Sequence, residues 1–138
     1  MHHDKPVREA MTSSPTTVEP ATSIEEAARL MKSEDVGALP IVEGDRLAGI
    51  ITDRDIAIRA VAEGRFDCTV GDIASKEIVS IDPQQTLEEA GRLMAEHQVR
   101  RLPVCEEDGR LVGILAQADV ATTGHDHLTG EVVEHISR

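Results

Sequence analysis

Two stretches of the chain carry small and apolar residues at the i, i+3, i+4, i+7 spacing of a helix that packs on one side. The first comprises Ile24, Ala27, Ala28 and Met31, and the second comprises Leu87, Ala90, Gly91 and Met94. Charged residues separate these positions. The pattern therefore predicts two amphipathic helices, each with a narrow face of modest size toward a core.

Each predicted helix is preceded by the S/T-x-x-E spacing of a capping box. Ser23 stands three residues before Glu26, and Thr86 stands three residues before Glu89. In a capping box the hydroxyl accepts from one backbone N–H at the helix start, and the carboxylate accepts from another. The spacing predicts that the helices begin directly after Ser23 and Thr86.

Short apolar runs flank the two helices. A turn of helix over Val7 to Met11, or Val70 to Ala74, is expected to lead into a strand at Thr16 to Val18, or Val79 to Ile81. After the long helix, Ala-Leu-Pro-Ile-Val or Arg-Leu-Pro-Val-Cys reads as a strand. Proline removes one ladder donor, so this strand is expected at a sheet edge or with a bulge.

A turn with Gly-Asp or Asp-Gly then leads into a second hairpin strand, Leu47 to Ile51 or Leu111 to Leu115. A further helix is expected to start at Asp53 or Gln117. The order in each copy is β-α-β-β-α, with helices on one face of a small sheet. We predict an α/β, or α+β-like, fold in which two such units pack as a pseudo-two-fold module, because a unit of about 60 residues buries too little surface alone.

These paired features arise because the chain is an internal duplication. Ile24-Glu-Glu-Ala-Ala-Arg-Leu-Met aligns with Leu87-Glu-Glu-Ala-Gly-Arg-Leu-Met at an offset of about 63 residues. One inserted residue near Glu107 raises the offset to about 64 for the rest of the repeat. We predict a first repeat at 7–63, a linker at 64–69, a second repeat at 70–124 and a tail at 125–138 with helical character.

Composition and charge exclude several classes of function. The 138 residues carry 14 Lys and Arg against 26 Asp and Glu, a formal net charge of −12, which disfavours nucleic-acid polymers and acidic membranes as partners. Phe66 is the sole aromatic residue, so recognition of bases by aromatic stacking has no basis. No apolar run is long enough to span a bilayer, and we expect a cytoplasmic protein without membrane contact.

Cysteine, histidine and nucleophilic residues do not form a familiar reactive pattern. Cys68 and Cys105 are too few for a disulfide framework, and we expect Cys105 to be buried and Cys68 to be the more exposed. His125 and His127 form one local pair, whereas structural zinc sites normally use two, so no metal site is predicted. No nucleophile elbow or Walker-type phosphate loop occurs, and we expect no enzymatic activity.

The duplicated pattern resembles a pair of CBS domains, the module that takes its name from cystathionine beta-synthase. The residues that carry this resemblance are Val36-Gly-Ala-Leu-Pro-Ile-Val with Gly49-Ile-Ile-Thr-Asp-Arg-Asp-Ile, and Val99-Arg-Arg-Leu-Pro-Val with Gly113-Ile-Leu-Ala-Gln-Ala-Asp-Val. The match spans nearly the whole chain. It is similar to the stand-alone CBS-pair proteins of bacteria, among them those called hypoxic response protein.

The resemblance implies a cleft between the repeats that senses an adenosine-containing ligand. AMP, ADP and ATP come first among such ligands, followed by S-adenosylmethionine and NADH, and no cofactor is required. The carboxylates of Asp55 and Asp119 are suited to accept from the ribose diol, because an ionised carboxylate is an acceptor only. The candidates for the base are Thr17, Leu39, Pro40, Ile41, Ser80 and Pro103.

The phosphate candidates differ between the two copies. Thr52 and Arg54 provide a hydroxyl and a guanidinium at a helix start, but Ala116 and Ala118 replace them in the second copy. Arg101 precedes the second Leu-Pro pair, and the resemblance implies that it binds phosphate. We therefore expect one competent site centred on Thr52 and Asp55, and a weaker one near Asp119. A purely structural role also fits, since Thr52 and Asp55 suit a helix cap whatever binds there.

These patterns favour a non-catalytic regulatory module that senses a nucleotide and signals to a separate protein partner. The resemblance also implies a homodimer formed by helix faces, for which Ile56 to Ile58, Ala60 and Val61 are candidates. The alternative is a ligand-independent stress or redox-responsive interaction protein whose clefts are vestigial and whose function depends on Cys68 or on the acidic surface.

Overall fold

The computed structural model describes residues 5–75 and 77–124, which form two compact units. Unit 1 contains the described residues of Met1–Ser14, Val79–Asp108 and Val112–Arg138. Unit 2 contains the described residues of Pro15–Ile78 and Gly109–Leu111. The tail at 125–138, for which the sequence predicted helical character, lies outside the described residues.

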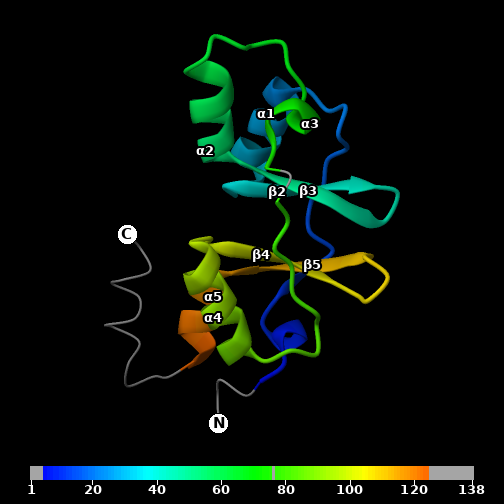
Figure 1. Cartoon of the computed structure of the whole chain (residues 1–138), viewed down its shortest axis with the longest axis vertical. Helices are drawn as coiled ribbons and strands as arrows, with labels where there is room; N and C mark the ends of the chain where they lie inside the picture. The colour runs from blue at the N-terminus through cyan, green and yellow to red at the C-terminus, as the bar shows by residue number, and fades with distance from the viewer. Residues whose placement is uncertain (1–4, 76, 125–138) are drawn as a thin grey trace. The chain divides into compact units, whose positions relative to one another are not determined.

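Unit 2 is built on the antiparallel hairpin of β2 (Ala38–Glu43) and β3 (Arg46–Thr52). Figure 1 shows helices on one side of this hairpin, as predicted. They are α1 (Ile24–Glu34), α2 (Asp53–Asp55) with the π-helix η3 (Ile56–Val61) that continues it, and α3 (Val70–Ile73). The unit has its own aliphatic core, which includes Leu39, Ile41 and Ile51.

Unit 1 repeats this arrangement with a three-stranded sheet. The strands are β1 (Thr12–Ser13), β5 (Leu111–Ala116) and β4 (Arg101–Cys105), in that order. The helices are the 3-10 turn η2 (Val7–Glu9), α4 (Leu87–His97) and α5 (Gln117–Gly124) (Figure 1). Its separate core includes Leu87, Met94 and Leu102.

The compact units and the sequence repeats divide the chain differently, because each repeat gives its leading segment to the other unit. Thr12 of the first repeat pairs with Ile114 in unit 1. The aligned residue of the second repeat, Ser75, pairs with Ile50 in unit 2. This reciprocal exchange supplies each small sheet with backbone partners that its own repeat does not provide.

The two long helices begin where the capping patterns predicted. In α4 both halves of the box are present, with Thr86 and Glu89 each accepting from the other's backbone N–H. In α1 the Ser23 hydroxyl accepts from Glu26 N at 3.1 Å. The predicted apolar face of α1 is wrong at Ala28, which is exposed, while Leu30 packs against the core instead. Burial of a leucine removes more apolar area from water than burial of an alanine. The helix therefore packs Leu30 against the core and leaves Ala28 in solvent.

The proline strands confirm the expected edge and bulge. β2 belongs to a two-stranded sheet and its register shifts between Ile41 and Val42, and β4 lies at one end of its sheet. The N–H and C=O of one residue point to the same side of a strand. Since Pro40 O accepts from Val18 N at 3.0 Å, the imino nitrogen of Pro40 faces the outer edge, away from β3.

This geometry explains why the predicted strands at Thr16 to Val18 and Val79 to Ile81 are wrong. Each is reduced to one parallel bridge, Val18 with Ile41 and Ile81 with Val104. In a parallel ladder the next bond toward the N-terminus would require a donor on the proline nitrogen, which has none. The proline in the neighbouring strand therefore ends each ladder on its N-terminal side.

We predict that Gly113→Ala weakens unit 1, because β1 crosses β5 closely at this residue. A Cβ at Gly113 would lie 2.8 Å from the Thr12 carbonyl oxygen and 2.5 Å from the Met11 sulfur. The strand must shift to admit it, and we expect the free energy of unfolding in urea to fall by about 1–3 kcal/mol. Gly49→Ala is the matched control, since its Cβ meets its nearest atoms at 3.6 Å. Equal effects of the two substitutions would contradict this account.

Candidate functional site

The candidate site in unit 2 lies where β3 passes into the helical segment α2 to η3. Thr52 ends β3, and its hydroxyl oxygen accepts from Asp55 N at 3.0 Å. In return, Oδ2 of Asp55 accepts from Thr52 N at 3.0 Å. The two residues thus form a complete capping box, which holds Oδ2 of Asp55 against the end of the strand.

The second carboxylate oxygen of Asp55 points toward a residue that sequence reasoning missed. Arg59 Nε lies 3.9 Å from Asp55 Oδ1, and the side chain of Asp55 is 17% exposed while that of Arg59 is 53% exposed. Their i, i+4 spacing on a helical segment was the signal that could have identified the pair. A carboxylate has about four acceptor positions, so the capping bond leaves Asp55 with capacity for further donors.

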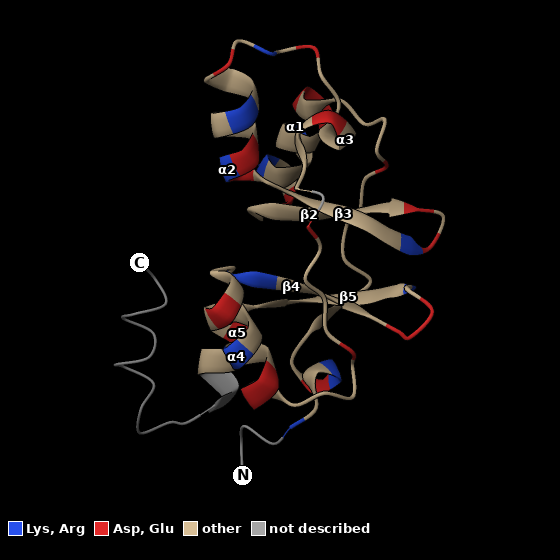
Figure 2. Ribbon diagram, in the orientation of Figure 1, with Lys and Arg blue, Asp and Glu red and all other residues tan. Residues whose placement is uncertain are grey.

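Arg54, the predicted phosphate ligand, is exposed at the first turn of the same segment. Its backbone N–H donates to Asp53 Oδ1 at 2.8 Å. Arg54 lies between Asp53 and Asp55, so basic and acidic residues alternate at α2 (Figure 2). This turn offers both a donor for an anion and acceptors for hydroxyl groups.

Most side chains of the predicted base-binding strand in unit 2, β2, are buried. Leu39 and Ile41 are each 1% exposed, and Pro40 is also buried, so a ligand could contact this strand only through its backbone. The sequence also predicts that Pro40 leaves neighbouring backbone groups free for the base at an open edge, and this prediction is wrong. Pro40 O and Val42 N both bond to Val18, because the chain before α1 occupies this edge. Thr17, next to Val18, is half-buried.

Unit 1 contains the equivalent set of predicted residues. Oδ2 of Asp119 accepts from Ala116 N at 2.9 Å, which repeats the bond between Asp55 and Thr52 N without the hydroxyl partner. Pro103 is buried and its carbonyl oxygen accepts from Ile81 N at 3.0 Å. Arg101 is half-buried, and Ser80 is exposed. The predicted site residues thus fall into two groups, one in each unit.

The cysteines are both free thiols, and one of them differs from the sequence prediction. Cys105 is buried as expected, and burial raises its pKa. The expectation that Cys68 is the more exposed of the two is wrong, since it is 6% exposed against 8% for Cys105, and its thiol donates to Arg65 O at 3.5 Å. Cys68, in the segment before α3, is itself part of the buried core of unit 2.

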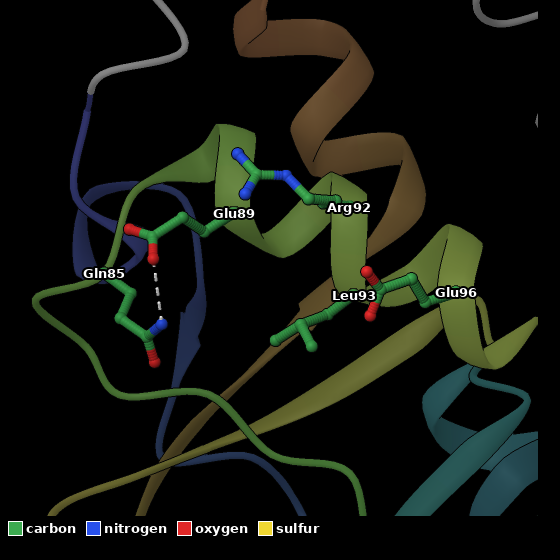
Figure 3. A pocket seen from close by; sticks show the side chains of 5 residues that line it. All are labelled: Gln85, Glu89, Arg92, Leu93 and Glu96. Carbon is green, nitrogen blue, oxygen red and sulfur yellow. Dashed lines mark hydrogen bonds between the residues drawn. The ribbon is translucent and has the colours of Figure 1, made fainter.

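A shallow pocket follows one side of α4 in unit 1 (Figure 3). Its lining residues are Gln85, Glu89, Arg92, Leu93 and Glu96. Glu89 accepts from Thr86 N at 3.1 Å and from Gln85 Nε2 at 3.2 Å, so its carboxylate serves the capping box of the helix. None of the predicted ligand-binding residues lines this pocket.

Residues 5–75 and 77–124 contain neither a metal-binding cluster nor a membrane-spanning helix. Within these ranges, no group of three or more His, Cys, Asp or Glu residues could hold a metal ion. His125, His127 and His135 lie outside them. None of the helices that the structure describes is long and apolar enough to cross a membrane.

Comparison with known proteins shows that the chain is similar to a family of regulatory modules. A family model described as CBS domain matches residues 7–61 and 70–125. The CBS domain-containing protein YhcV of Bacillus subtilis is 49% identical over 116 residues, which cover 83% of this chain and 82% of YhcV. Hypoxic response protein 1 of Mycobacterium tuberculosis is 39% identical over 132 residues, which cover 94% of this chain and 92% of that protein.

Solved structures show the same fold. The crystal structure of Hypoxic Response Protein I with two coordinated zinc ions has a TM-score of 0.77 at 40% identity, and covers 86% of this chain and 98% of that one. The CBS domain pair of MJ0100 in complex with 5-methylthioadenosine and S-adenosyl-L-methionine has a TM-score of 0.80 at 27% identity, over 86% and 94%. CBSX2 in complex with AMP has a TM-score of 0.74 at 27% identity, over 96% and 98%. Related CBS pairs thus bind adenosine-containing molecules.

The capping box of α4 predicts a defined pH dependence of stability. The hydrogen bonds to Glu89 from Thr86 N and then from Gln85 hold its pKa below the ordinary value of 4.5. A carboxyl group whose folded pKa is depressed adds stability above its unfolded pKa, and this is lost as the pH falls through the folded pKa. We therefore expect Glu89→Gln to lower the urea midpoint most above pH 4.5, with the difference from wild type shrinking below it.

The control for this measurement is Glu26→Gln at the aligned position of α1, where the cap is the hydrogen bond from Glu26 N to Ser23 Oγ. We expect a smaller pH-dependent difference for this variant. A Glu89→Gln difference that stays constant from pH 3 to pH 7 would show that its carboxylate is not stabilised by the box.

Proposed function

Because this chain belongs to the CBS domain family, with both copies of the domain present, we propose that it is a non-catalytic regulatory module that binds an adenine nucleotide at Thr52–Asp55 and signals to a separate protein. The observation that carries the proposal is the Asp55 carboxylate. One of its oxygens is anchored to the end of β3, and its side chain is still 17% exposed. The anchor holds a carboxylate acceptor at the surface of unit 2.

The chemistry of a ribose diol fits such an acceptor. Two vicinal hydroxyls can donate to a carboxylate that has no proton of its own to offer. The Thr52 hydroxyl accepts from Asp55 N and keeps its own hydrogen available for donation. The proposed roles are ribose recognition for Asp55 and additional hydrogen bonding for Thr52.

Arg54 supports a phosphorylated ligand. Its guanidinium lies on the exposed first turn after Thr52, within the same short segment as the ribose acceptor. Guanidinium groups bind phosphate with two parallel hydrogen bonds, so AMP, ADP or ATP is favoured over an unphosphorylated adenosine derivative. AMP is bound by CBSX2, a relative in fold and sequence.

The two copies of the motif support unequal sites. Unit 1 keeps the aspartate bond to the strand end but has Ala116 and Ala118 where unit 2 has Thr52 and Arg54. At the start of this helix the side-chain donors are therefore in unit 2, whereas the candidate donor of unit 1 is Arg101 of β4. A ligand that binds one conformation of the module more tightly than another would shift the population toward it, and the partner would respond to that shift.

The alternative function, a redox-responsive interaction protein that depends on Cys68, has less support. An oxidant would have to reach a thiol that is 6% exposed and hydrogen-bonded to Arg65 O. Reactive cysteines normally lie in accessible, electropositive surroundings. The burial of Cys68 therefore favours nucleotide sensing over oxidation as the signal.

We predict that Asp55→Asn weakens AMP binding at least about tenfold, because hydrogen bonds to a charged acceptor contribute about 1.5–3 kcal/mol. Asparagine retains an oxygen that can accept from Thr52 N, so the cap is preserved while the charge is removed. Calorimetric titration gives the dissociation constants of AMP and of 2′,3′-dideoxy-AMP for each variant. Wild type should prefer AMP, and Asp55→Asn should lose most of this preference.

The matched control is Asp53→Asn, an exposed carboxylate in the same turn. We expect it to bind both ligands as wild type does. Unchanged AMP affinity in Asp55→Asn, or wild type that does not distinguish the two ligands, would refute ribose recognition by Asp55.

We further propose that the module acts as a homodimer through η3. Ile58 and Val61 are each 52% exposed, whereas Ala60, also a sequence candidate, is fully buried and cannot take part.

We predict that Ile58→Glu converts a dimer into a monomer in light scattering after gel filtration, because a charge would then be buried in an apolar contact. Val36→Glu, at a site 42% exposed on unit 2, is the control. A wild-type monomer would contradict the proposal.

A further inference from the structure

We propose that Arg59 is a positioning residue that orients Asp55 and ties it to the end of α3, so that ribose binding at Asp55 is transmitted to α3. The inference rests on the proposed function, since it takes Asp55 as the ribose acceptor. It adds a residue and a route by which the bound ligand changes the module.

One guanidinium makes both contacts. Its Nε lies 3.9 Å from Asp55 Oδ1, and its Nη1 donates to the carbonyl oxygen of Ile73 at 3.1 Å. Arginine has five donors in a planar fork, so the direction of one contact constrains the direction of the other. The position of Arg59 is therefore linked at the same time to η3 and to α3.

The acceptor on α3 is a group that requires an outside donor. Ile73 is the last residue of this short helix, and the final carbonyl groups of a helix have no partner within it. The Ile73 side chain is 2% exposed and belongs to the core of unit 2. A movement of Arg59 would thus act on a segment that is packed into the unit.

A second set of contacts also links Asp55 to the α3 segment, so that together with Arg59 the contacts form a closed ring. Asp55 Oδ2 accepts from Thr52 N at the end of β3. Two residues earlier in β3, Ile50 pairs with Ser75, which follows Ile73 by two positions. Asp55 is therefore connected to the α3 segment by two routes, one through β3 and one through Arg59, and both lie within unit 2.

The ring gives Arg59 a defined effect on ribose binding. The terminal torsion of an aspartate is broad, so a single hydrogen bond to Oδ2 does not by itself fix the position of Oδ1. The charge of Arg59 beside Oδ1 restricts that oxygen. A ribose diol that donates to the Asp55 carboxylate must share it with Arg59. Binding therefore changes the position of Arg59, and with it the hydrogen bond to the Ile73 carbonyl oxygen.

The other copy of the motif has no arginine at the aligned position. The residue aligned with Arg59 is Thr123, at an offset of about 64, and the residue aligned with Ile73 is Ala10, at an offset of about 63. Threonine has neither the charge nor the reach for a second contact. The coupling is therefore confined to unit 2, which also holds the side-chain donors of the proposed nucleotide site.

The test compares Arg59→Met and Arg59→Lys with wild type in the whole chain, using AMP and 2′,3′-dideoxy-AMP as probes. Methionine keeps most of the apolar stem, and lysine keeps the charge without the planar fork. We expect Arg59→Met to reduce the preference for AMP about two- to fivefold, as fits a partly exposed ion pair. Arg59→Lys should restore part of that preference. Loss of affinity for both probes alike would show a merely structural role and overturn the proposal.

Amide hydrogen exchange provides the second readout. Ala74 N donates to Val70 O at 2.9 Å and reports on α3. We expect AMP to slow the exchange of α3 amides in wild type, and Arg59→Met and Arg59→Lys both to lose this effect. The matched control is Arg29→Met, which removes another i, i+4 pair of the same unit, Arg29 with Glu25 at 3.2 Å, and should change neither readout.

The outcomes separate this inference from the proposed function. An AMP preference that depends on Asp55 and not on Arg59 would refute the positioning role alone. A wild type without AMP preference would refute ribose recognition, and the tie to α3 would then be decided in the ligand-free protein. There, unchanged exchange of the α3 amides in Arg59→Met would overturn it.

Discussion

The fold of each unit depends on one hydrogen bond, from the backbone N–H at the end of the second hairpin strand to an aspartate three residues later. Asp55 accepts from Thr52 N at 3.0 Å and Asp119 accepts from Ala116 N at 2.9 Å. Without that acceptor, the N–H at the junction of strand and helix would lose its partner. The bond also sets where the helix starts, and hence which of its side chains face the core. A residue that is easily taken for a ligand contact is thus first a requirement of the fold.

The prolines of β2 and β4 place a second constraint on both units. Each removes the donor that would let the preceding segment extend into a strand, so Val18 and Ile81 make a single bridge apiece. The sheets stay small, and they gain partners from the leading segments of the opposite repeats, at Thr12 and Ser75. Exchange of these segments makes the two repeats mutually dependent for their sheets. A duplication is therefore needed for the fold, and an isolated repeat would lack a piece of its own unit.

Much of the fold could be predicted from local patterns, and the failures have identifiable causes. The starts of α1 and α4 followed from hydroxyl and carboxylate spacing, and the edge position of β2 followed from Pro40, because both effects act within a few residues. The exchange of leading segments could not be predicted, since Thr12 and Ser13 are polar, exposed and about 100 residues from their partners in the sequence. The burial of Cys68 likewise depends on a nonlocal contact. For the candidate site, the spacing of Asp55 and Arg59 was visible in the sequence, but the contact with Ile73 was not.

The structural role of the aspartate changes how the duplicated motif should be interpreted. Because both copies use the aspartate to cap the strand end, the capping bond of Asp55 or Asp119 alone does not distinguish a ligand site from a helix cap. The informative positions are those at which the copies differ while the bond from the aspartate to the strand end is kept. Thr52, Arg54 and Arg59 are replaced by Ala116, Ala118 and Thr123, and none of these replacements removes the bond from the aspartate to the strand. Unit 1 therefore shows that the fold needs only the aspartate at this junction. The polar side chains that unit 2 adds, Thr52, Arg54 and Arg59, are not required by the fold, and ligand binding is the role that accounts for them.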